Sequence, residues 1–550
     1  MKRDHVYPCF KRLLMLGLSA VLIAASFSPL SASAAPRPPQ QQVPTADAVR
    51  FLEQATFGPT PALIARVQNS GFKDFLEQEF SARVSLYNNL PVFPDDSAVG
   101  CPDGTAPPNC FRDNYTQWPH QLQFFLNALY GEDQLRQRVA FALGQIFVVS
   151  GVEIIQPSSL GPYLNIFQRN AFGNYRQILE EVTLSPAMGR YLDMANNRRQ
   201  APNENYAREV LQLFSIGQFK LNTDGTLQLD GLGQPIPTYD QNTIINFSRL
   251  FTGWTYPPKP GVRNLAINPE YYIGKMVSSE SNHDRNSKTL LDGFVVPANQ
   301  KAETEIKLAL DNIFNHPNVA PFICKQLIQH LVTSNPSPAY LGRISAVFNN
   351  NGQGVRGDLK AVVAAILLDS EARGDLQSGA SYGHMREPVL FITNVLRAFG
   401  ATSDGALLAE QGRNMGQYLF YSPTVFNYYL PGYVVPGTTV LGPEFSIQST
   451  SASIARANFV NTMVFSRINN PGSLGTQLTL TDMQNLASNT NALLDELNRI
   501  LMHGSMSTAM RDRIFTVVNA LPNVTAADRL KRAQWAIYLV LTSSQFQVER

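Results

Sequence analysis

The chain has 550 residues, with 44 Lys plus Arg against 42 Asp plus Glu, and a formal net charge of +2 at pH 7. A balance this close to neutral lacks the basic surface that neutralises nucleic-acid phosphates, so we expect no nucleic-acid partner. The length suffices for two or more substructures or for one large helical body.

The first 34 residues have the pattern of a secretory signal peptide. Basic residues precede an apolar run from Leu13 to Phe27, and small residues at 32–34 offer a cleavage site before Ala35. The apolar run falls short of the roughly 20 residues that a spanning helix needs, which disfavours an uncleaved anchor. We therefore expect export to the periplasm or beyond, and no membrane span after cleavage.

The next segments change from flexible to helical and then to irregular. Residues 35–44 are rich in Pro and Gln, which predicts a flexible lead-in, and a helix is predicted at 45–55. Residues 81–115 form a long irregular segment in which Cys101 and Cys110 flank a loop rich in Pro and Gly. In an exported protein this pair predicts a disulfide that pins the loop. Cys324, in an apolar run, is expected to be a buried free thiol.

Helical periodicity dominates the remainder of the chain. Helices are predicted at 118–130, 132–149, 174–183, 186–193, 240–251, 302–314, 320–332, 339–348, 358–368 and 387–399, and through most of 449–546. Between them, Asp224 and Gly225 indicate a β-hairpin, and short strands are predicted around 271–276. The predicted fold is mainly α: a single large helical domain over 45–550, with short hairpin and strand insertions around 218–300.

One stretch is unusually dense in polar side chains. Residues 203–209 open an apolar helix, and Glu204 and Arg208 lie one turn apart, as do Asn205 and Glu209. Two further segments carry groups that can converge on this helix start: a loop with His283 and Asp284, and the end of an earlier helix at Asp193. Together these residues predict a polar site.

Three interpretations of this site stay open. A divalent metal could be bound by Glu209, His283 and Asp284, with Asp193 as a further ligand, because nitrogen and carboxylate donors suit hard or borderline metals. Alternatively, His283 could act as an acid or base without a metal. In the third interpretation the charges only stabilise the fold, with Arg208 paired to Glu204.

Several motifs resemble one known bacterial family. Residues 134–142, 203–209, 251–254, 283–284, 386–388 and 425–428, in this order and spacing within about 46–546, resemble the family called domain of unknown function 1800. The resemblance implies an exported bacterial protein. It also implies a partner, since such proteins are often encoded beside exported proteins that look like sulfatases or alkaline phosphatases.

Two functions follow as hypotheses. The first is a hydrolase acting on an extracellular polymer or an anionic ester, with Glu209 and His283 as principal residues and Arg208 binding the anion. In it, Asp284 orients the histidine or binds a metal. The alternative is a secreted binding or assembly partner of the sulfatase-like protein, without chemistry of its own. Further residues are assigned to ligand binding in this site: Asn203, Glu204, Asp193 and Trp254.

Overall fold

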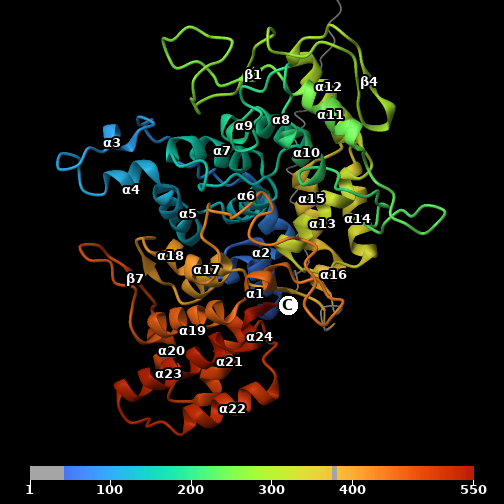
Figure 1. The fold of residues 1–550 in the computed structure, drawn as a ribbon. Coiled ribbons are helices and arrows are strands. Elements are labelled where there is room, and N and C mark those ends of the chain that lie inside the picture. The colour runs from blue at the N-terminus through green and yellow to red at the C-terminus, as the bar shows by residue number, and fades with distance from the viewer. Residues whose placement is uncertain (1–41, 375–378, 380) are drawn as a thin grey trace, which may run out of the picture. The chain divides into compact units, whose positions relative to one another are not determined.

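The computed structural model describes residues 42–374, 379 and 381–550, and these residues are mainly α-helical, as predicted (Figure 1). The predicted signal peptide at 1–34 and most of the lead-in lie outside the described residues. Across the described part of the chain, no helix has both the length and the apolar character of a membrane span.

The helices and strands follow one another in a long series. The helices before residue 320 are α1 (Thr45–Ala55), α2 (Pro61–Ser81), α3 (Ser97–Gly100), α4 (Cys110–Tyr115), α5 (Trp118–Tyr130), α6 (Gln134–Ile146), α7 (Pro157–Asn170), α8 (Tyr175–Thr183), α9 (Pro186–Tyr191), α10 (Asn205–Gln212), α11 (Gln241–Leu250), η1 (Leu291–Gly293), α12 (Ala302–Asn315) and α13 (Val319–Leu331). The later ones are α14 (Pro338–Asn349), α15 (Leu359–Leu368), α16 (Ser370–Arg373), α17 (Pro388–Ala398), α18 (Leu408–Asn414), η3 (Pro443–Ile447), α19 (Thr450–Phe465), α20 (Thr481–Leu486), α21 (Thr490–Leu501), α22 (Thr508–Asn519), α23 (Ala526–Leu541) and α24 (Ser544–Gln547). The strands form two-residue antiparallel pairs: β1 (Trp254–Thr255) with β2 (Val277–Ser278), β3 (Lys288–Thr289) with β4 (Val295–Val296), β5 (His384–Met385) with β8 (Val548–Glu549), and β6 (Thr402–Ser403) with β7 (Thr476–Gln477).

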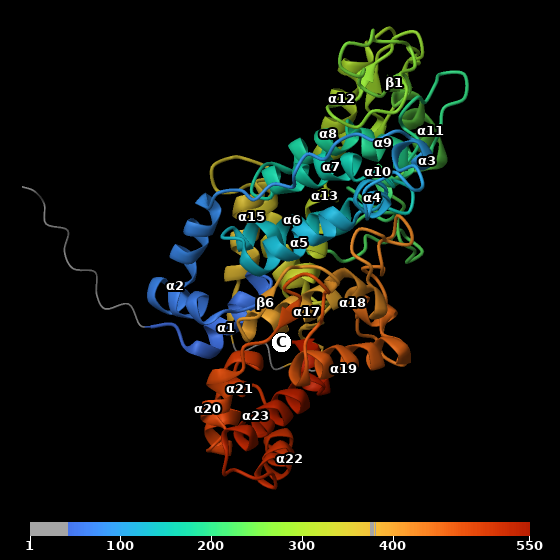
Figure 2. The same ribbon diagram turned by 90° about the vertical axis from the view of Figure 1, so that its left-hand side faces the viewer.

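Two hydrophobic cores organise residues 42–550. The first is built mainly on α1, α2 and α6–α15, and the second on α5 and α17–α23. Figures 1 and 2 show the later elements, in orange and red, gathered on one side of the earlier ones. Helix α6 belongs to both cores, because Leu135 packs in the first and Phe141 in the second.

Helix α6 is buried on every face although it is not apolar on every face. Its buried side chains include Gln137, Arg138 and Gln145. A buried polar group must find a partner within the protein, so these side chains oblige the elements around α6 to supply hydrogen bonds and charges. This requirement gathers polar residues from distant parts of the chain at the end of α6.

The two cysteine predictions are confirmed. Cys101 and Cys110 form a disulfide with a Cα–Cα distance of 5.8 Å, and it closes the loop that leads into α4. Cys324 is a free thiol without solvent exposure on α13.

The insertions around 218–300 are correct in kind and partly wrong in place. The hairpin forms: Gly225 takes the left-handed conformation with φ of 80°, and Leu221 bridges Leu227. The strand predicted around 271–276 is wrong, because that stretch is irregular and contains Gly274 with φ of 108°; β2 begins only at Val277.

Candidate functional site

The residues of the predicted polar site do not meet in one cleft. Arg208 Nη2 lies 2.9 Å from Glu204 Oε2 across one turn, and the Gln241 side chain also donates to Glu204. This pairing is the one that the structural interpretation of the sequence described. Both side chains remain about one third exposed, so their ion pair contributes little to stability.

His283 is inaccessible to solvent. Its Nδ1 donates to the carbonyl of Thr252 at 2.8 Å, and its Nε2 lies 3.2 Å from Glu305 Oε2. Lys288 Nζ lies 2.8 Å from the same carboxylate oxygen. His283, Lys288 and Glu305 are each at most 1 % exposed, so they form a buried ionic contact that solvent does not reach.

Asp284 is committed to an arginine. Arg249 binds it with two N–H donors at 3.0 and 3.2 Å, and the backbone N–H of Asn286 adds a third at 2.9 Å. Burial alone would raise the pKa of Asp284, but these donors outweigh burial and hold it below its usual range. An ionised carboxylate engaged in this way stabilises the loop instead of binding a ligand.

Asp193 and Asn203 do lie together. Both line a shallow surface hollow of about 510 Å³, and Asn205, beside Asn203, donates from its amide to Asp193 Oδ2 at 2.7 Å. Trp254 is not part of this hollow; it is 3 % exposed in β1. The hollow therefore holds two of the eight predicted site residues.

Glu209 stands apart from His283. Burial raises the pKa of its carboxyl against the influence of Arg208, and its Oε2 has no hydrogen-bond partner in the part of the chain that the structure describes. Within the same residues it forms no hydrogen bond or ion pair with His283, Asp284 or Asp193, and no three His, Cys, Asp or Glu side chains are arranged to hold a metal.

A different place in the fold has the features of a binding site. A cavity of about 590 Å³ lies between the end of α6, α13, the hairpin arm at 213–227, the loop at 425–432 and the start of η3. We call it the Glu444 cavity. Its polar lining consists of Gln145, Gln212, Gln218, Lys325, Gln326, Gln329, His330, Asn427, Tyr429 and Glu444. Apolar side chains such as Phe219, Phe322 and Leu430 complete the wall.

Glu387 fixes three polar groups of this lining. Its carboxylate accepts from Gln145 Nε2 at 3.1 Å and from the Tyr429 hydroxyl at 2.8 Å, and also from Gln417. Gln145 in turn accepts from Asn427 Nδ2 at 2.9 Å. Gln145, Asn427 and Tyr429 are therefore locked by contacts behind the cavity and not by the cavity itself.

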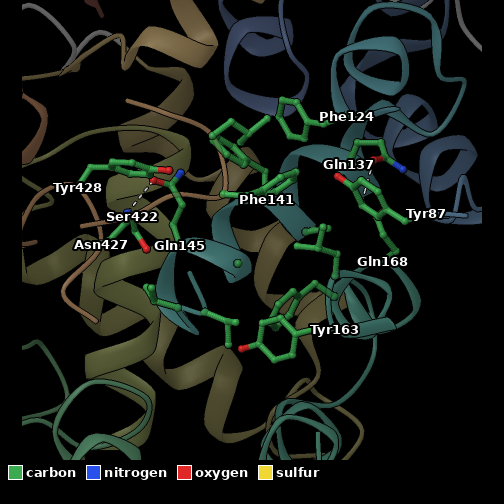
Figure 3. A pocket seen from close by; sticks show the side chains of 18 residues that line it. Tyr87, Phe124, Gln137, Phe141, Gln145, Tyr163, Gln168, Ser422, Asn427 and Tyr428 are labelled. Atoms are coloured by element: carbon green, nitrogen blue, oxygen red, sulfur yellow. Dashed lines mark hydrogen bonds between the residues drawn. The ribbon is translucent and has the colours of Figure 1, made fainter. Parts of the chain in front are cut away.

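Gln145 and Asn427 also separate the Glu444 cavity from a smaller one. That second cavity measures about 50 Å³ and is lined by aromatic side chains such as Phe141 and Tyr163 together with aliphatic and amide residues. Figure 3 shows it with the contact between Gln145 and Asn427 at its edge. Its volume suits a few water molecules, whereas the larger cavity suits an organic ligand.

Among the described residues that line the cavity, Glu444 is the one carboxylate. It is 3 % exposed, its Oε1 lies 3.5 Å from His384 Nδ1, and its Oε2 has no hydrogen-bond partner among the described residues. On the far side of the imidazole, Nε2 lies 3.5 Å from Glu549 Oε2. Burial alone would lower the pKa of His384, but the carboxylates of Glu549 and Glu444 raise it to about 9.

Arg138 balances these negative charges from α6. It is fully buried, donates to the carbonyl of His330, and faces the carboxylates of Glu387, Glu549 and Glu444. Burial raises the pKa of Glu387, and Arg138 opposes that rise. Unpaired buried carboxylates would be costly, and Arg138, together with His384 and Arg386, offsets their charge.

Lys325 supplies an unpaired positive charge to the lining. Burial lowers the pKa of its ammonium, and within the described residues it has no hydrogen bond or ion pair. His330, five residues further along α13, is neutral, because burial, together with Arg138 and His384, lowers its pKa to about 3. The cavity thus presents one free ammonium, one half-paired carboxylate and several amides.

Sequence reasoning missed this site although its residues were in view. His330 and His384 show no partners along the sequence, because their partners come from η3, α6 and β8. Three of the motifs that carry the family resemblance supply the cluster: 134–142 contains Arg138, 386–388 contains Glu387, and 425–428 contains Asn427. Polar residues embedded in apolar runs were the available signal.

The fold and the cavity define a large α-helical protein with a cavity backed by buried charges. The family described as "Protein of unknown function (DUF1800)" matches residues 50–548, so the chain belongs to this family. No curated protein and no solved structure matched the chain.

Proposed function

We propose that the protein is an exported bacterial protein that binds an acidic, hydroxyl-rich ligand, an acidic saccharide chain, in the Glu444 cavity. One observation carries the proposal. A single cavity of about 590 Å³ combines an amide-rich lining with Lys325, which has no partner among the described residues. Ligand sites of this size combine an apolar wall with a few fixed polar groups.

The lining matches the chemistry of a saccharide. Each glutamine or asparagine side chain offers both a donor and an acceptor, as a hydroxyl group requires of its partners. Phe219 and Phe322 provide surfaces for the C–H faces of sugar rings. Lys325 has no anionic partner among the residues that the structure describes, so a carboxylate or sulfate group on the ligand would neutralise it.

A second candidate function, ester hydrolysis, rests on Glu444. Glu444 Oε1 lies beside His384, and its Oε2 has no hydrogen-bond partner among the described residues, so in this candidate function Oε2 would take a proton from water as the water oxygen attacks a carbonyl carbon. Lys325 would stabilise the negative charge that develops on the carbonyl oxygen, and the departing alkoxide would then take the proton back from Glu444. A sulfatase-like partner would act on the same acidic class of saccharide.

Calorimetric titration tests binding. Purified protein is titrated with oligogalacturonate and with a neutral maltooligosaccharide of equal length. We expect the acidic ligand to bind, and Lys325→Met to weaken it about tenfold or more, the equivalent of about 1.4 kcal/mol. Lys360→Met is the matched control, because Lys360 lies on the surface and pairs with Glu77. Equal binding by Lys325→Met and wild type, or no preference for the acidic ligand, would contradict the proposal.

Ester hydrolysis is tested separately. Methyl-esterified oligogalacturonate is incubated with the protein, and released methanol is measured. Glu444→Gln should abolish release while still binding the unesterified ligand. Binding without any release would leave the protein as a binding partner without chemistry.

A further inference from the structure

We infer that Glu549 is a positioning residue for the Glu444 cavity and that it acts on Glu444 through His384. The inference deepens the proposed function, since it assigns to two buried residues, Glu549 and His384, the control of the carboxylate that lines the cavity. It rests on the proposed function in one respect, namely that Glu444 contacts a ligand in the cavity.

The three side chains form a line from the core to the cavity. His384 lies between two carboxylates, with Glu444 Oε1 3.5 Å from Nδ1 and Glu549 Oε2 3.5 Å from Nε2. Each of the three residues is 3 % exposed, so water does not screen these charges. Only Glu444 lines the cavity.

The backbone holds Glu549 in this line. In the antiparallel pair of β5 and β8, His384 is the register partner of Glu549, and the Arg386 N–H donates to the Gln547 carbonyl at 2.9 Å. Gly383, just before β5, has φ of 97°, and a Cβ at that position would lie 2.0 Å from the Glu549 carbonyl oxygen. The chain at 548–549 therefore fits against β5 only because residue 383 is glycine.

The charges around His384 decide its state. Glu549 on β8 and Glu444 on η3 favour the protonated form of His384. His330 on α13 lies near His384, so a positive charge on both rings would be unfavourable. Because burial has already driven His330 to its neutral form, that opposition is weak at neutral pH. The net effect of burial and of the two carboxylates is a His384 pKa of about 9.

Glu549 has its own charged neighbours. Burial would raise its pKa, but His384, Arg386 and Arg138 outweigh burial and lower it. Glu53 on α1 is the like charge that faces Glu549. Glu549 is thus ionised at neutral pH, where His384 is protonated, and the imidazolium lies beside one oxygen of Glu444 while the other has no hydrogen-bond partner among the described residues.

Loss of the Glu549 charge should release this arrangement. In Glu549→Gln, burial is no longer opposed by two carboxylates, so His384 should lose its proton at a lower pH. Glu444 would then lose its cationic partner and turn away from the imidazole. The raised pKa of His384 stabilises the folded protein fully below the ordinary histidine pKa of 6.5, and this stabilisation is lost as pH rises through about 9. The effect of Glu549→Gln on His384 must therefore appear at alkaline pH.

The experiment compares wild type, Glu549→Gln and Glu79→Gln. Glu79 is a matched control, a buried carboxylate paired with Arg66 outside this line. Nitrogen-15 NMR of histidine-labelled protein follows the His384 ring, assigned with His384→Asn, and oligogalacturonate binding is measured from pH 6 to 10. In Glu549→Gln, we expect two quantities to shift to lower pH by at least one unit: the titration midpoint of His384 and the pH at which binding is lost on the alkaline side. Glu79→Gln should show neither shift.

Crystal structures of wild type and Glu549→Gln at pH 8 separate this inference from the proposed function. If wild type binds no oligogalacturonate, the proposed function is wrong, whereas the inference is still supported by a lowered His384 midpoint with a displaced Glu444. It is overturned if the His384 midpoint is unchanged, or if Glu444 stays beside His384 in the variant. If Glu549 only stabilises the fold, Glu549→Gln should lower the melting temperature at every pH and leave the titration midpoint of His384 unchanged.

Discussion

The Tyr429 hydroxyl donates a hydrogen bond of 2.8 Å to Glu387, and this contact joins the wall of the Glu444 cavity to the charges buried behind it. Tyr429 comes from a loop, whereas Glu387 precedes α17 and is held by three donors. Glu387 is therefore one of the anchors of the loop at 425–432, beside the hydrogen bonds of Asn427 to Gln145 and of Gln329 to the Pro431 carbonyl.

Tyr429→Phe should destabilise the protein by about 1–3 kcal/mol, because it removes one donor from a buried carboxylate. Urea unfolding gives the free energy. Tyr433→Phe is the control, since the Tyr433 hydroxyl has no hydrogen bond to any described residue and should change stability by less than about 0.5 kcal/mol. An equal effect of both substitutions would mean that the contact with Glu387 does not contribute.

Glu305→Ala should be among the most destabilising single substitutions in the chain. It leaves Lys288 buried without its carboxylate and His283 without its Nε2 partner, and breaking a buried pair in this way costs about 3–5 kcal/mol. Glu303→Ala, on the same helix and exposed, is the control. Unfolding free energies check both. If Glu305→Ala retained full stability and instead lost oligogalacturonate binding, the sealed contact would be functional after all.

Removal of the disulfide should cost about 2–3 kcal/mol, the chain-entropy value for closing a loop of about ten residues. The double variant Cys101→Ser, Cys110→Ser should melt at a lower temperature than wild type. Dithiothreitol should lower the melting temperature of wild type and leave that of the variant unchanged. A drop of equal size in the variant on reduction would show that the stabilisation comes from elsewhere.

Glu53 should make stability depend on pH between about 4.5 and 7. Burial raises the pKa of this carboxyl to about 7, although Arg386 opposes the rise. A carboxyl whose pKa is higher in the folded state binds its proton more tightly there, so its contribution is present at low pH and is lost as pH rises from about 4.5 to about 7. Unfolding free energies at pH 5 and 8 should therefore differ less in Glu53→Gln than in wild type.

A matched comparison for Glu53 is Glu371, which is also buried but whose carboxylate accepts from Ser337. Glu371→Gln should leave the difference between pH 5 and pH 8 as it is in wild type. The prediction for Glu53 is contradicted if the two variants flatten the dependence equally.

Much of the fold could be predicted from the sequence because it depends on local signals. The helix predicted at 118–130 is α5, and Pro388 stands in the first turn of α17, where its missing N–H is harmless. The hairpin at Asp224 and Gly225 needed only a turn residue with positive φ. Boundaries were less secure: the helix predicted at 132–149 spans only Gln134–Ile146.

The candidate site could not be predicted because its contacts are long-range. His384 is polarised by residues 60 and 165 positions further along the chain, Glu444 and Glu549. In contrast, Glu204 and Arg208 drew attention because they lie one helical turn apart, yet that proximity only yields a surface ion pair. Sequence spacing finds pairs within one element and gives no information on which elements meet.

Helix α6 has a consequence for how the protein unfolds. The second core draws Phe124 and Phe125 from α5 and Phe141 from α6, so the later half of the chain cannot complete its interior once the earlier half is removed. A fragment that begins between α15 and α17 should therefore be unable to fold alone.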